Sequence, residues 1–400
     1  MIDPFRQTAM ARVPRGIWAL GLVSLLMDVS SEMIHSLLPV FMVGTLGASA
    51  LMLGLVEGGA EATGLIVKVV SGAWSDRIGR RKPLALAGYA IGALSKPLFA
   101  LAGSAGAVLG ARLIDRVGKG IRGAPRDALV ADLAPPALRG AAFGLRQSLD
   151  TVGAFVGPLV AIGLMLLWAN DVRAVFWVAI VPGLLAVVVL LFGVHEPARA
   201  APPVRTDPLR RDALRRLHAP YWWVVGIGAV FMLARFSEAF LVLRAVQGGL
   251  PLAWTPLVLV GMNLVYLLAA YPLGSWSDRV PHGRLLAAGL LLLIVADGLL
   301  ACGSGWPWVV SGVALWGMHM GTTQGLLARM VADAAPADLR GTAYGWFNLA
   351  SGLALLAASV TAGWLWDAFG ARSTFVAGAA FSALALLVLA LRPSVSIRSA

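Results

Sequence analysis

The chain contains uncharged apolar runs that are longer than a soluble protein can use. Residues 175–194, VFWVAIVPGLLAVVVLLFGV, hold no Asp, Glu, Lys or Arg over 20 positions. A helix of about 20 residues rises about 30 Å, the thickness of a bilayer's hydrocarbon core. In lipid the backbone must satisfy its own hydrogen bonds, so only helices or a closed barrel can span it. These runs are continuous rather than alternating, and they therefore predict membrane-spanning helices.

The composition supports a membrane protein. Hydrophobic residues make up 59 % of the 400 residues and charged residues 13 %, against about 45–50 % and about 25 % in soluble domains. The net charge of +12 would suggest nucleic acid in a soluble protein, but in a multi-span protein basic residues gather on the cytoplasmic side. The partner is thus the bilayer and not nucleic acid. A single cysteine, Cys302, excludes an internal disulfide and a cysteine-cluster metal site.

Gly, Pro and charge clusters divide the chain into twelve predicted helices. Their expected ranges are 16–44, 50–72, 84–103, 104–124, 141–165, 172–194, 219–245, 252–275, 285–304, 307–332, 342–366 and 371–391. The expected fold class is an all-α membrane protein with twelve transmembrane helices in two six-helix halves. The halves cover residues 16–194 and 219–392, separated by a polar linker, 195–218, and flanked by short ends, 1–15 and 393–400.

The distribution of basic residues predicts the orientation. Lys and Arg cluster before the first helix, after the second and fourth, and in the linker, whereas the connections near 45–49, 103–106, 247–251 and 301–306 contain none. Positive-inside logic therefore places both termini and the linker in the cytoplasm. We expect a multi-pass protein of the plasma membrane, which in a bacterium is the inner membrane.

Two segments of the first half recur in the second. GAWSDRIGRRKPL (72–84) reappears as GSWSDRVPHGRLL (274–286), and VADLAPPALRGAAFG (130–144) as VADAAPADLRGTAYG (331–345). The second pair is identical at ten of fifteen positions, and the offsets are 202 and 201 residues. One duplication explains both repeats. Two parallel six-helix halves are a transporter architecture, with the substrate site between them near the middle of the membrane.

The first repeated segment resembles the signature loop of the major facilitator superfamily, which runs approximately G-x-x-x-D-R-x-G-R-R/K. The first copy matches it at Gly72, Asp76, Arg77, Gly79, Arg80 and Arg81. The second copy keeps Asp278 and Arg279 but has Pro281 and His282 where the first has glycine and arginine. With Arg139 and its counterpart Arg340, these residues form the predicted gate motif. The resemblance implies a secondary transporter rather than an enzyme, moving a small-molecule substrate and protons, without a cofactor or metal and as a monomer.

The segment ARLIDRVGKGIRGAPRD (111–127) concentrates charge in this apolar chain. A phosphate loop, G-x-x-x-x-G-K-[ST], would need glycine at 113 and Ser or Thr at 120, where the chain has Leu113 and Gly120. A cytoplasmic loop suits the end of the segment but not Arg112, which lies about 10 Å into the membrane at 1.5 Å per residue. Arg112, Arg116 and Lys119 share one helix face, and Asp115 can pair with Lys119. We therefore predict a charged stripe that faces a water-accessible cavity.

Other charged residues at helical spacings are candidate partners for this stripe. They are Asp28, Glu32 and His35 in the first helix, Glu57 and Glu61 in the second, Arg146 and Asp150 in the fifth, and Arg235 and Glu238 in the seventh. Depth along the helices places Glu32 near Arg112 and Asp28 nearer the middle, and we expect Glu32 and Asp28, with Arg112 as their principal partner, to be the proton-coupling site. The network is either a static set of salt bridges or a device in which one carboxylate exchanges a proton with the cavity.

The fifth helix carries a glycine pattern, Gly144, Gly153 and Gly157-Pro158, that resembles the motif of antiporter members, although Ala161 and Ile162 stand where two further glycines are usual. The segments DVSSEMIHSLLPVF (28–41) and DRVGKGIRGAPRDALVAD (115–132) resemble a poorly characterised prokaryotic branch of proton-linked exporters. We therefore expect a proton-coupled efflux antiporter of a small organic solute. A proton symporter that imports an organic anion is the alternative, and a non-transporting receptor on the same fold a remote one.

Overall fold

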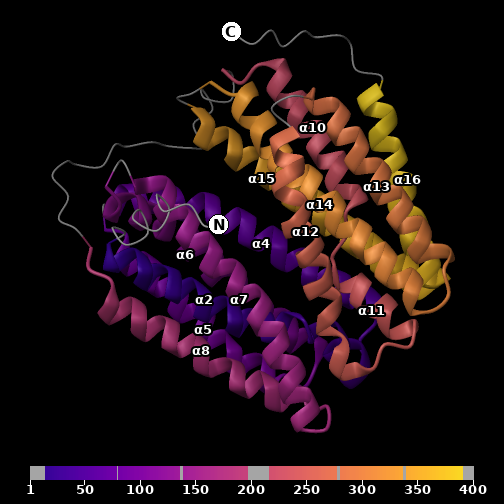
Figure 1. Cartoon of the computed structure of the whole chain (residues 1–400), viewed down its shortest axis with the longest axis horizontal. Helices are drawn as coiled ribbons and strands as arrows, with labels where there is room; N and C mark the ends of the chain where they lie inside the picture. The colour runs from indigo at the N-terminus through magenta and orange to yellow at the C-terminus, as the bar shows by residue number, and fades with distance from the viewer. Residues whose placement is uncertain are drawn as a thin grey trace, which may run out of the picture. The chain divides into compact units, whose positions relative to one another are not determined.

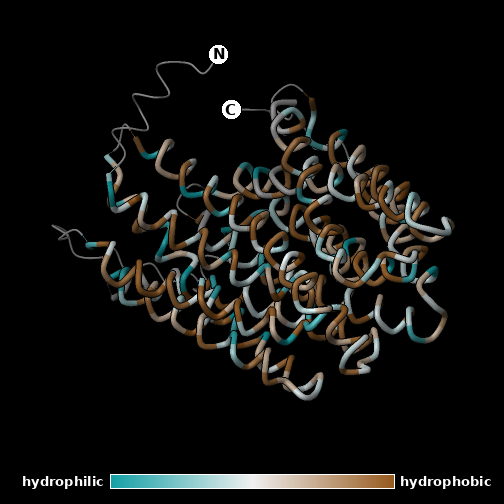
Figure 2. Tube along the Cα trace, turned by 60° about the horizontal axis from the view of Figure 1, so that its bottom comes forward, coloured by the Kyte–Doolittle hydropathy of each residue, from teal (hydrophilic) through white to brown (hydrophobic). Residues whose placement is uncertain are grey.

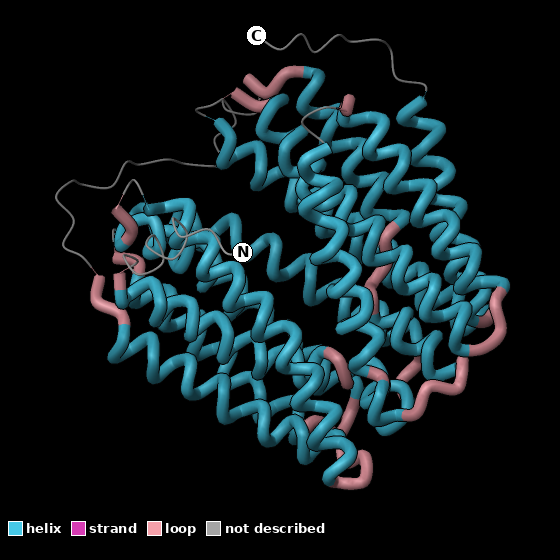
Figure 3. Tube along the Cα trace, in the orientation of Figure 1, coloured by secondary structure: helices cyan, strands magenta, loops and turns pink. Residues whose placement is uncertain are grey.

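A computed structural model gives the fold of the chain. It describes residues 14–78, 80–135, 138–196, 216–276, 280–336 and 339–390, apart from the side chains of residues 72, 73, 75–78, 271, 274–276, 324, 325, 328, 340 and 341. Within these ranges every regular element is a helix (Figure 3). The predicted all-α class is confirmed.

The described helices account for all twelve predicted spans. Those of the first half are α2 (Arg15–His35) with α3 (Leu38–Val40) and the π-helical η1 (Phe41–Thr45), α4 (Ala50–Ile78), α5 (Lys82–Leu101), α6 (Ala105–Leu133), α7 (Arg139–Leu167) and α8 (Val172–Gly193). Those of the second half are α10 (Ala219–Ala234) with α11 (Ala239–Gln247), the 3₁₀ turn η3 (Leu252–Trp254) with α12 (Pro256–Trp276), α13 (His282–Cys302), α14 (Trp306–Ala334), α15 (Arg340–Phe369) and α16 (Ala371–Ala390).

The first predicted span is interrupted near its C-terminal end. The regular helix ends at His35, and a short turn and a π-helical segment continue it to Thr45. Pro39 explains the interruption, because proline has no N–H group and its ring clashes with the carbonyl four residues earlier, here that of His35. The expected continuous helix over 16–44 is therefore wrong in this detail.

The seventh span is also broken, and here the sequence offers neither Pro nor Gly. Helix α10 ends at Ala234 and α11 begins at Ala239. Two serine side chains replace the lost backbone partners: the Ser359 hydroxyl accepts from the Ser237 amide at 3.1 Å, and the Ser237 hydroxyl from the Ala239 amide at 3.2 Å. The expected single helix over 219–245 is corrected to two helices joined by an unwound segment.

The chain forms two compact units. One comprises Met1–Ala48, Gly59–Asp207 and Leu252–Leu257, and the other Ser49–Gly58, Pro208–Pro251 and Val258–Ala400. In the first, α2 packs against α7 and α8, and α5 against α6 and α8; in the second, α10 packs against α15 and α16, and α13 against α14 and α16. Figure 1 shows the helices of each unit running side by side. Equivalent helices pair in the same way in both units, as a duplicated sequence requires.

The outer surfaces of the helices are apolar. Ten helical segments in the described part of the chain are long and apolar enough to cross a membrane, and brown, hydrophobic residues line the helices in Figure 2. Large apolar side chains such as Leu101, Leu167 and Phe192 are 65–72 % exposed, which lipid contact explains. Helix α6 has the same length as α7, 29 residues, but its charged stripe lowers its mean hydropathy.

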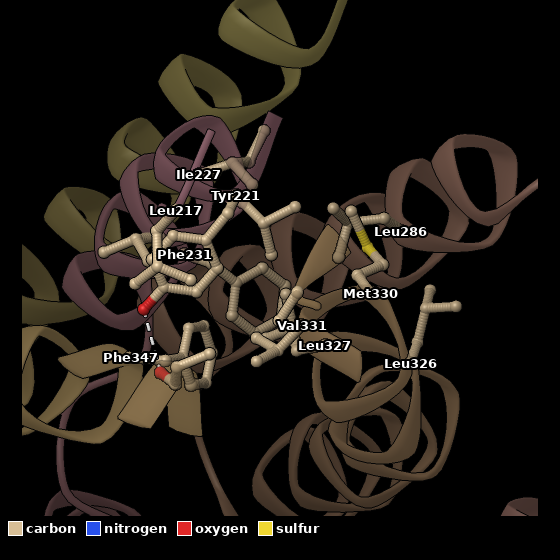
Figure 4. Packing of buried hydrophobic residues seen from close by; sticks show 14 of the residues in the cluster. Leu217, Tyr221, Ile227, Phe231, Leu286, Leu326, Leu327, Met330, Val331 and Phe347 are labelled. Atoms are coloured by element: carbon tan, nitrogen blue, oxygen red, sulfur yellow. Dashed lines mark hydrogen bonds between the residues drawn. The ribbon is translucent and has the colours of Figure 1, made fainter. Parts of the chain in front are cut away.

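Each unit also has an apolar core. In the second unit, Tyr221, Phe231, Leu286 and Val331 are buried together, and the Tyr221 hydroxyl donates to the Ala343 carbonyl at 2.8 Å (Figure 4). An equivalent cluster in the first unit is built around Tyr89 and side chains of α2, α5, α6, α7 and α8. These cores fix the helices on which the charged residues stand.

Candidate functional site

The charged stripe of α6 faces the interior of the first unit. Arg112, Asp115 and Arg116 are only 2 %, 3 % and 5 % exposed. Burial of three charges on one helix is costly unless partners compensate them. Asp115 pairs with a residue of α5 and Arg116 with a residue of α4.

The tightest ion pair in the stripe involves a residue that the sequence did not single out. Lys96 of α5, 1 % exposed, places its Nζ 2.7 Å from Oδ1 of Asp115 and 3.0 Å from the Ser31 hydroxyl. Arg112 lies on the other side of Asp115, at 3.9 Å. The expected local pair between Asp115 and Lys119 is therefore wrong, because Asp115 turns toward α5 instead.

Close packing of α5 on α6 explains this choice. A Cβ added to Gly118 would lie 2.7 Å from the Gly88 carbonyl oxygen and 2.8 Å from the Gly92 amide. Small residues that let two backbones approach are typical of helix contacts in membranes. The approach brings Lys96 within reach of Asp115 one turn away.

The next residue of the stripe pairs with α4. Arg116 Nη2 lies 2.9 Å from Glu61 Oε1, so the predicted meeting of these two helices is seen in the structure. Glu57, one turn earlier, is 2 % exposed and belongs to the part of α4 that groups with the second unit.

The acids of α2 take partners other than the one we expected. Glu32 bonds with Nδ1 of His35 at 3.4 Å, and the predicted pair of Glu32 with Arg112 is not among the contacts of the described side chains. Asp28 lines the same pocket as Asp150 of α7. In the described part of the chain Asp28 forms no ion pair within 4 Å.

The fifth predicted helix contributes a small network with the C-terminal part of α6. Asp150 lies 3.7 Å from Arg146, as its spacing of four predicted, and 3.6 Å from Arg126 of α6. Asp127 contacts Arg126 at 3.2 Å and Arg146 at 4.0 Å. The expected range of α6, 104–124, leaves Arg126 and Asp127 in the following loop. In the structure α6 continues to Leu133 and brings both residues into the network.

Two glycines of the antiporter-like motif press α7 directly against the acids of α2. A Cβ added to Gly153 would lie 2.5 Å from the Leu25 carbonyl oxygen and 3.0 Å from Asp28 Cβ, and one added to Gly157 would lie 3.0 Å from Glu32 Cβ. Gly144, by contrast, has open space around it. Pro158 lies inside the same helix, next to the second contact.

The gate motif is described only in part. Helix α4 extends to Ile78, which corrects the predicted end of this helix at 72. The first half of the gate motif is therefore helical and not a loop. Several gate residues lie outside the described structure: Gly79, Asp278 and Arg279 entirely, and the side chains of Asp76, Arg77 and Arg340. Gly72 is seen only as helical backbone. Arg80 and Arg139 are exposed.

The described end of the gate motif has partners that the sequence did not predict. Arg81 Nη1 lies 3.0 Å from Asp132 at the end of α6. The backbone amides of Arg81 and Lys82 both donate to the Glu196 carboxylate, the second at 3.2 Å. A carboxylate at this position suits the free N–H groups and positive dipole end of α5.

The second unit contains fewer charges. Arg235 and Glu238 pair at 3.0 Å across the unwound segment between α10 and α11. Asp297 is fully buried and accepts a hydrogen bond from Trp316 at 3.0 Å. His319 is also buried, with Nδ1 2.7 Å from the Gly289 carbonyl oxygen and its ring stacked on Phe231. These contacts place His319 in the core of the second unit.

The charged helices of the first unit enclose a pocket of about 230 Å³. Its lining comes from α2, α4, α6 and α7, and consists of Asp28, Glu61, Gly64, Leu65, Lys68, Arg116, Lys119, Gly120, Arg122, Gly123, Arg126 and Asp150. Lys119 stands at the midpoint of α6 and Lys68 ten residues before the end of α4. A polar pocket at this depth suits a solute or proton site. In the described residues no group of three or more His, Cys, Asp or Glu is placed to hold a metal ion.

A comparison with family profiles shows which protein family this chain belongs to. The profile described as Major Facilitator Superfamily matches residues 20–261 and 249–399. The chain belongs to the major facilitator superfamily. This superfamily member is therefore a multi-pass membrane transporter of small molecules and not an enzyme.

Alignments with related proteins cover nearly the whole length of this transporter. It is 30 % identical over 382 residues to an uncharacterised MFS-type transporter of Methanocaldococcus jannaschii, with 94 % of each chain covered. It is 26 % identical over 364 residues to the multidrug resistance protein MdtH of Proteus mirabilis, covering 88 % of this chain and 87 % of that protein. A mutant of the nucleoside transporter NupG has a similar fold, with a TM-score of 0.80, 14 % identity and coverage of 94 % and 98 %.

Proposed function

We propose that this transporter is a proton-coupled exporter of a small organic solute, acting as a monomer in the plasma membrane with both termini in the cytoplasm. The observation that carries the proposal is the position of Asp28. Its carboxyl group lines the pocket beside Asp150 and forms no ion pair within the described residues. An acid without a salt-bridge partner in a membrane-embedded pocket is a candidate proton carrier.

The neighbouring groups provide a way to load and unload that proton. Two adjacent carboxylates repel, so a proton held between Asp28 and Asp150 stabilises the pair. Arg126 lies 3.6 Å from Asp150 and competes with that proton for the carboxylate. A change in helix position that strengthens the Arg126 contact then expels the proton, and one that weakens it favours uptake. Glu32, held by His35, is the second candidate carrier.

The glycines of α7 connect this chemistry to movement. Gly153 and Gly157 hold α7 in backbone contact with the turns of α2 that carry Asp28 and Glu32. Any displacement of α7 along α2 therefore changes the surroundings of both acids at once. Protonation and conformation become coupled, which is what alternating access driven by protons requires.

Export is favoured over import by two features. The glycine spacing of α7 resembles that of antiporter members, and its second and third glycines make the close contacts described above. Relatives named multidrug resistance proteins match most of the chain. Neither feature identifies the solute.

Everted membrane vesicles from cells producing the full chain test the proposal. Respiration acidifies the vesicle interior and quenches a pH-sensitive dye, and a solute panel is then added. An exporter exchanges solute for interior protons, so one solute class should restore the fluorescence, and Asp28→Asn should abolish the response. If no solute moves protons in everted vesicles, while whole cells accumulate one, the protein is an importer.

The alternative, import of an organic anion with protons, has one observation in its favour. The pocket is lined by five basic and three acidic residues, which attracts anions. In that case the solute would acidify the interior of right-side-out vesicles as it enters, and would give no response in everted ones.

A further inference from the structure

The charges that line the pocket of the first unit do not cancel. Arg116 is paired with Glu61 at 2.9 Å, and Arg126 with Asp150 at 3.6 Å. Of the lining residues, Asp28 is the one acid that remains. Three basic residues of the lining also lie outside these two ion pairs.

The remaining basic residues are Lys68, Lys119 and Arg122, and within the described structure none of them forms a salt bridge. Lys68 and Lys119 are exposed to the pocket. Lys68 reaches from α4 across to α6, where a Cβ added to Gly123 would lie 3.7 Å from its Cε.

Arg122 adds a buried positive charge behind the two lysines. It is 4 % exposed, and its guanidinium lies 4.9 Å from the centre of the Tyr89 ring. Its Nη1 atom is buried without a hydrogen-bond partner. A buried donor without an acceptor is costly in a protein interior, so an acceptor brought close to Arg122 would be favoured.

The pocket is small for a drug-sized ligand. Its 230 Å³ compares with about 300–1,000 Å³ for drug-sized sites, and with about 30 Å³ for one water molecule in the liquid. It has room for a compact charged group and a few water molecules. Lysine ammonium groups bind phosphate and carboxylate as point charges.

We propose that this pocket binds the anionic group of the transported solute, a phosphate or a carboxylate, between Lys68 and Lys119, with the charge of Arg122 behind them. The inference rests on the transport function but not on its direction or its coupling. The same chemistry could come from a free organic anion or from the headgroup of an anionic lipid that enters from the bilayer.

Anion binding by the purified full chain tests the proposal without any transport. The protein is placed in nanodiscs of phosphatidylcholine, and its thermal unfolding is followed during titration with inorganic phosphate, with sodium chloride at equal ionic strength as the reference. Phosphate should stabilise the protein saturably and more than chloride does. Lys68→Gln and Lys119→Gln should each raise the apparent Kd about tenfold or more, the usual cost of removing one partner of a charge pair.

Two variants control for folding and for nonspecific charge effects. Lys119→Arg keeps the charge and should retain binding. Lys82→Gln removes a lysine outside the pocket, whose Nζ bonds the Leu191 carbonyl oxygen, and should bind phosphate as the wild type does. Nanodiscs that contain phosphatidylglycerol distinguish the sources, because a lipid headgroup in the site would suppress the phosphate response whereas a free-anion site would keep it.

A phosphate response no larger than that of chloride in phosphatidylcholine nanodiscs overturns the inference, as does full binding by the Lys68→Gln and Lys119→Gln variants. If binding is absent while everted vesicles still show solute-driven proton movement, the solute is neutral or cationic and the proposed export function stands. If binding is present and no solute moves protons, the anion site stands and the proposed coupling falls.

Discussion

The buried pair of Lys96 and Asp115 should be a structural anchor of the first unit, and a double-mutant cycle can measure it. The two side chains are 1 % and 4 % exposed, and their charged atoms are 2.7 Å apart. Removal of one partner of such a pair leaves an uncompensated buried charge, at a cost of about 3–5 kcal/mol. We expect Lys96→Met to lower the free energy of unfolding by that amount, because Asp115 keeps only the Ser95 hydroxyl at 3.3 Å and Arg112 at 3.9 Å.

The double variant should recover much of this loss. When both partners are replaced by apolar residues of similar size, the desolvation penalty disappears with the attraction, and the net effect is often neutral. Lys96→Met combined with Asp115→Leu should therefore cost less than Lys96→Met alone. The coupling energy should reach about 3 kcal/mol, the upper end for contacting residues.

Unfolding free energies of the full chain in mixed dodecyl maltoside and SDS micelles, followed by tryptophan fluorescence, provide the measurement. Lys82→Met is the matched control, because its amine is bonded to a carbonyl at an exposed site and should change the free energy by less than about 1 kcal/mol. The reasoning would be refuted if Lys96→Met were as stable as this control. It would also be refuted if the loss of unfolding free energy in the double variant equalled the sum of the losses in the two single variants.

Three further predictions concern packing, topology and the gate. Gly153→Ala should destabilise the protein by about 1–3 kcal/mol in the same micelle assay, because its new Cβ would lie 2.5 Å from a carbonyl oxygen of α2, whereas Gly144→Ala, with open space around it, should not; equal losses would contradict the packing. In a cysteine-free background, cysteines at Ser104 and Pro208 should react from opposite sides of the membrane, and labelling of both from outside would contradict the predicted orientation. Asp76→Asn should depress transport and increase thiol labelling of the inner cavity without unfolding the protein, and unchanged transport with unchanged labelling would remove its gating role.

Much of the fold could be predicted from the sequence because each span is specified locally. An uncharged run of about 20 residues has few alternatives in lipid, and each of the twelve expected ranges is mostly helical in the described structure. The break at Arg235–Glu238 could not be predicted in this way, because it depends on a hydroxyl of Ser359 more than 100 residues away. The shorter break before Pro39 carried a signal in the sequence, since proline within a helical pattern marks an end or a kink.

The charged site was predicted in its location but not in its pairing. Periodicity placed the stripe of α6 on one buried face, yet it assigned Asp115 to Lys119, the local partner at a spacing of four. Asp115 pairs with Lys96 instead, because an ion pair between helices in a dry interface is stronger than an exposed pair within one helix. That contact exists only after Gly118 brings α5 and α6 together. Lys96 had no charged neighbour at helical spacing in its own helix, so no sequence pattern singled it out.

The most direct test of the proposed proton site compares two kinds of transport in the same proteoliposomes. Uphill solute movement driven by a pH gradient requires a net proton transfer, whereas exchange of labelled for unlabelled solute at equal pH does not. We predict that Asp28→Asn or Glu32→Gln abolishes the gradient-driven movement and spares the exchange. Arg112→Ala should lose both, because it removes one of the two cations beside the buried Asp115 and leaves Lys96 alone to compensate it. Uphill transport retained by both acid variants would show that the acids of α2 are structural and would contradict the account.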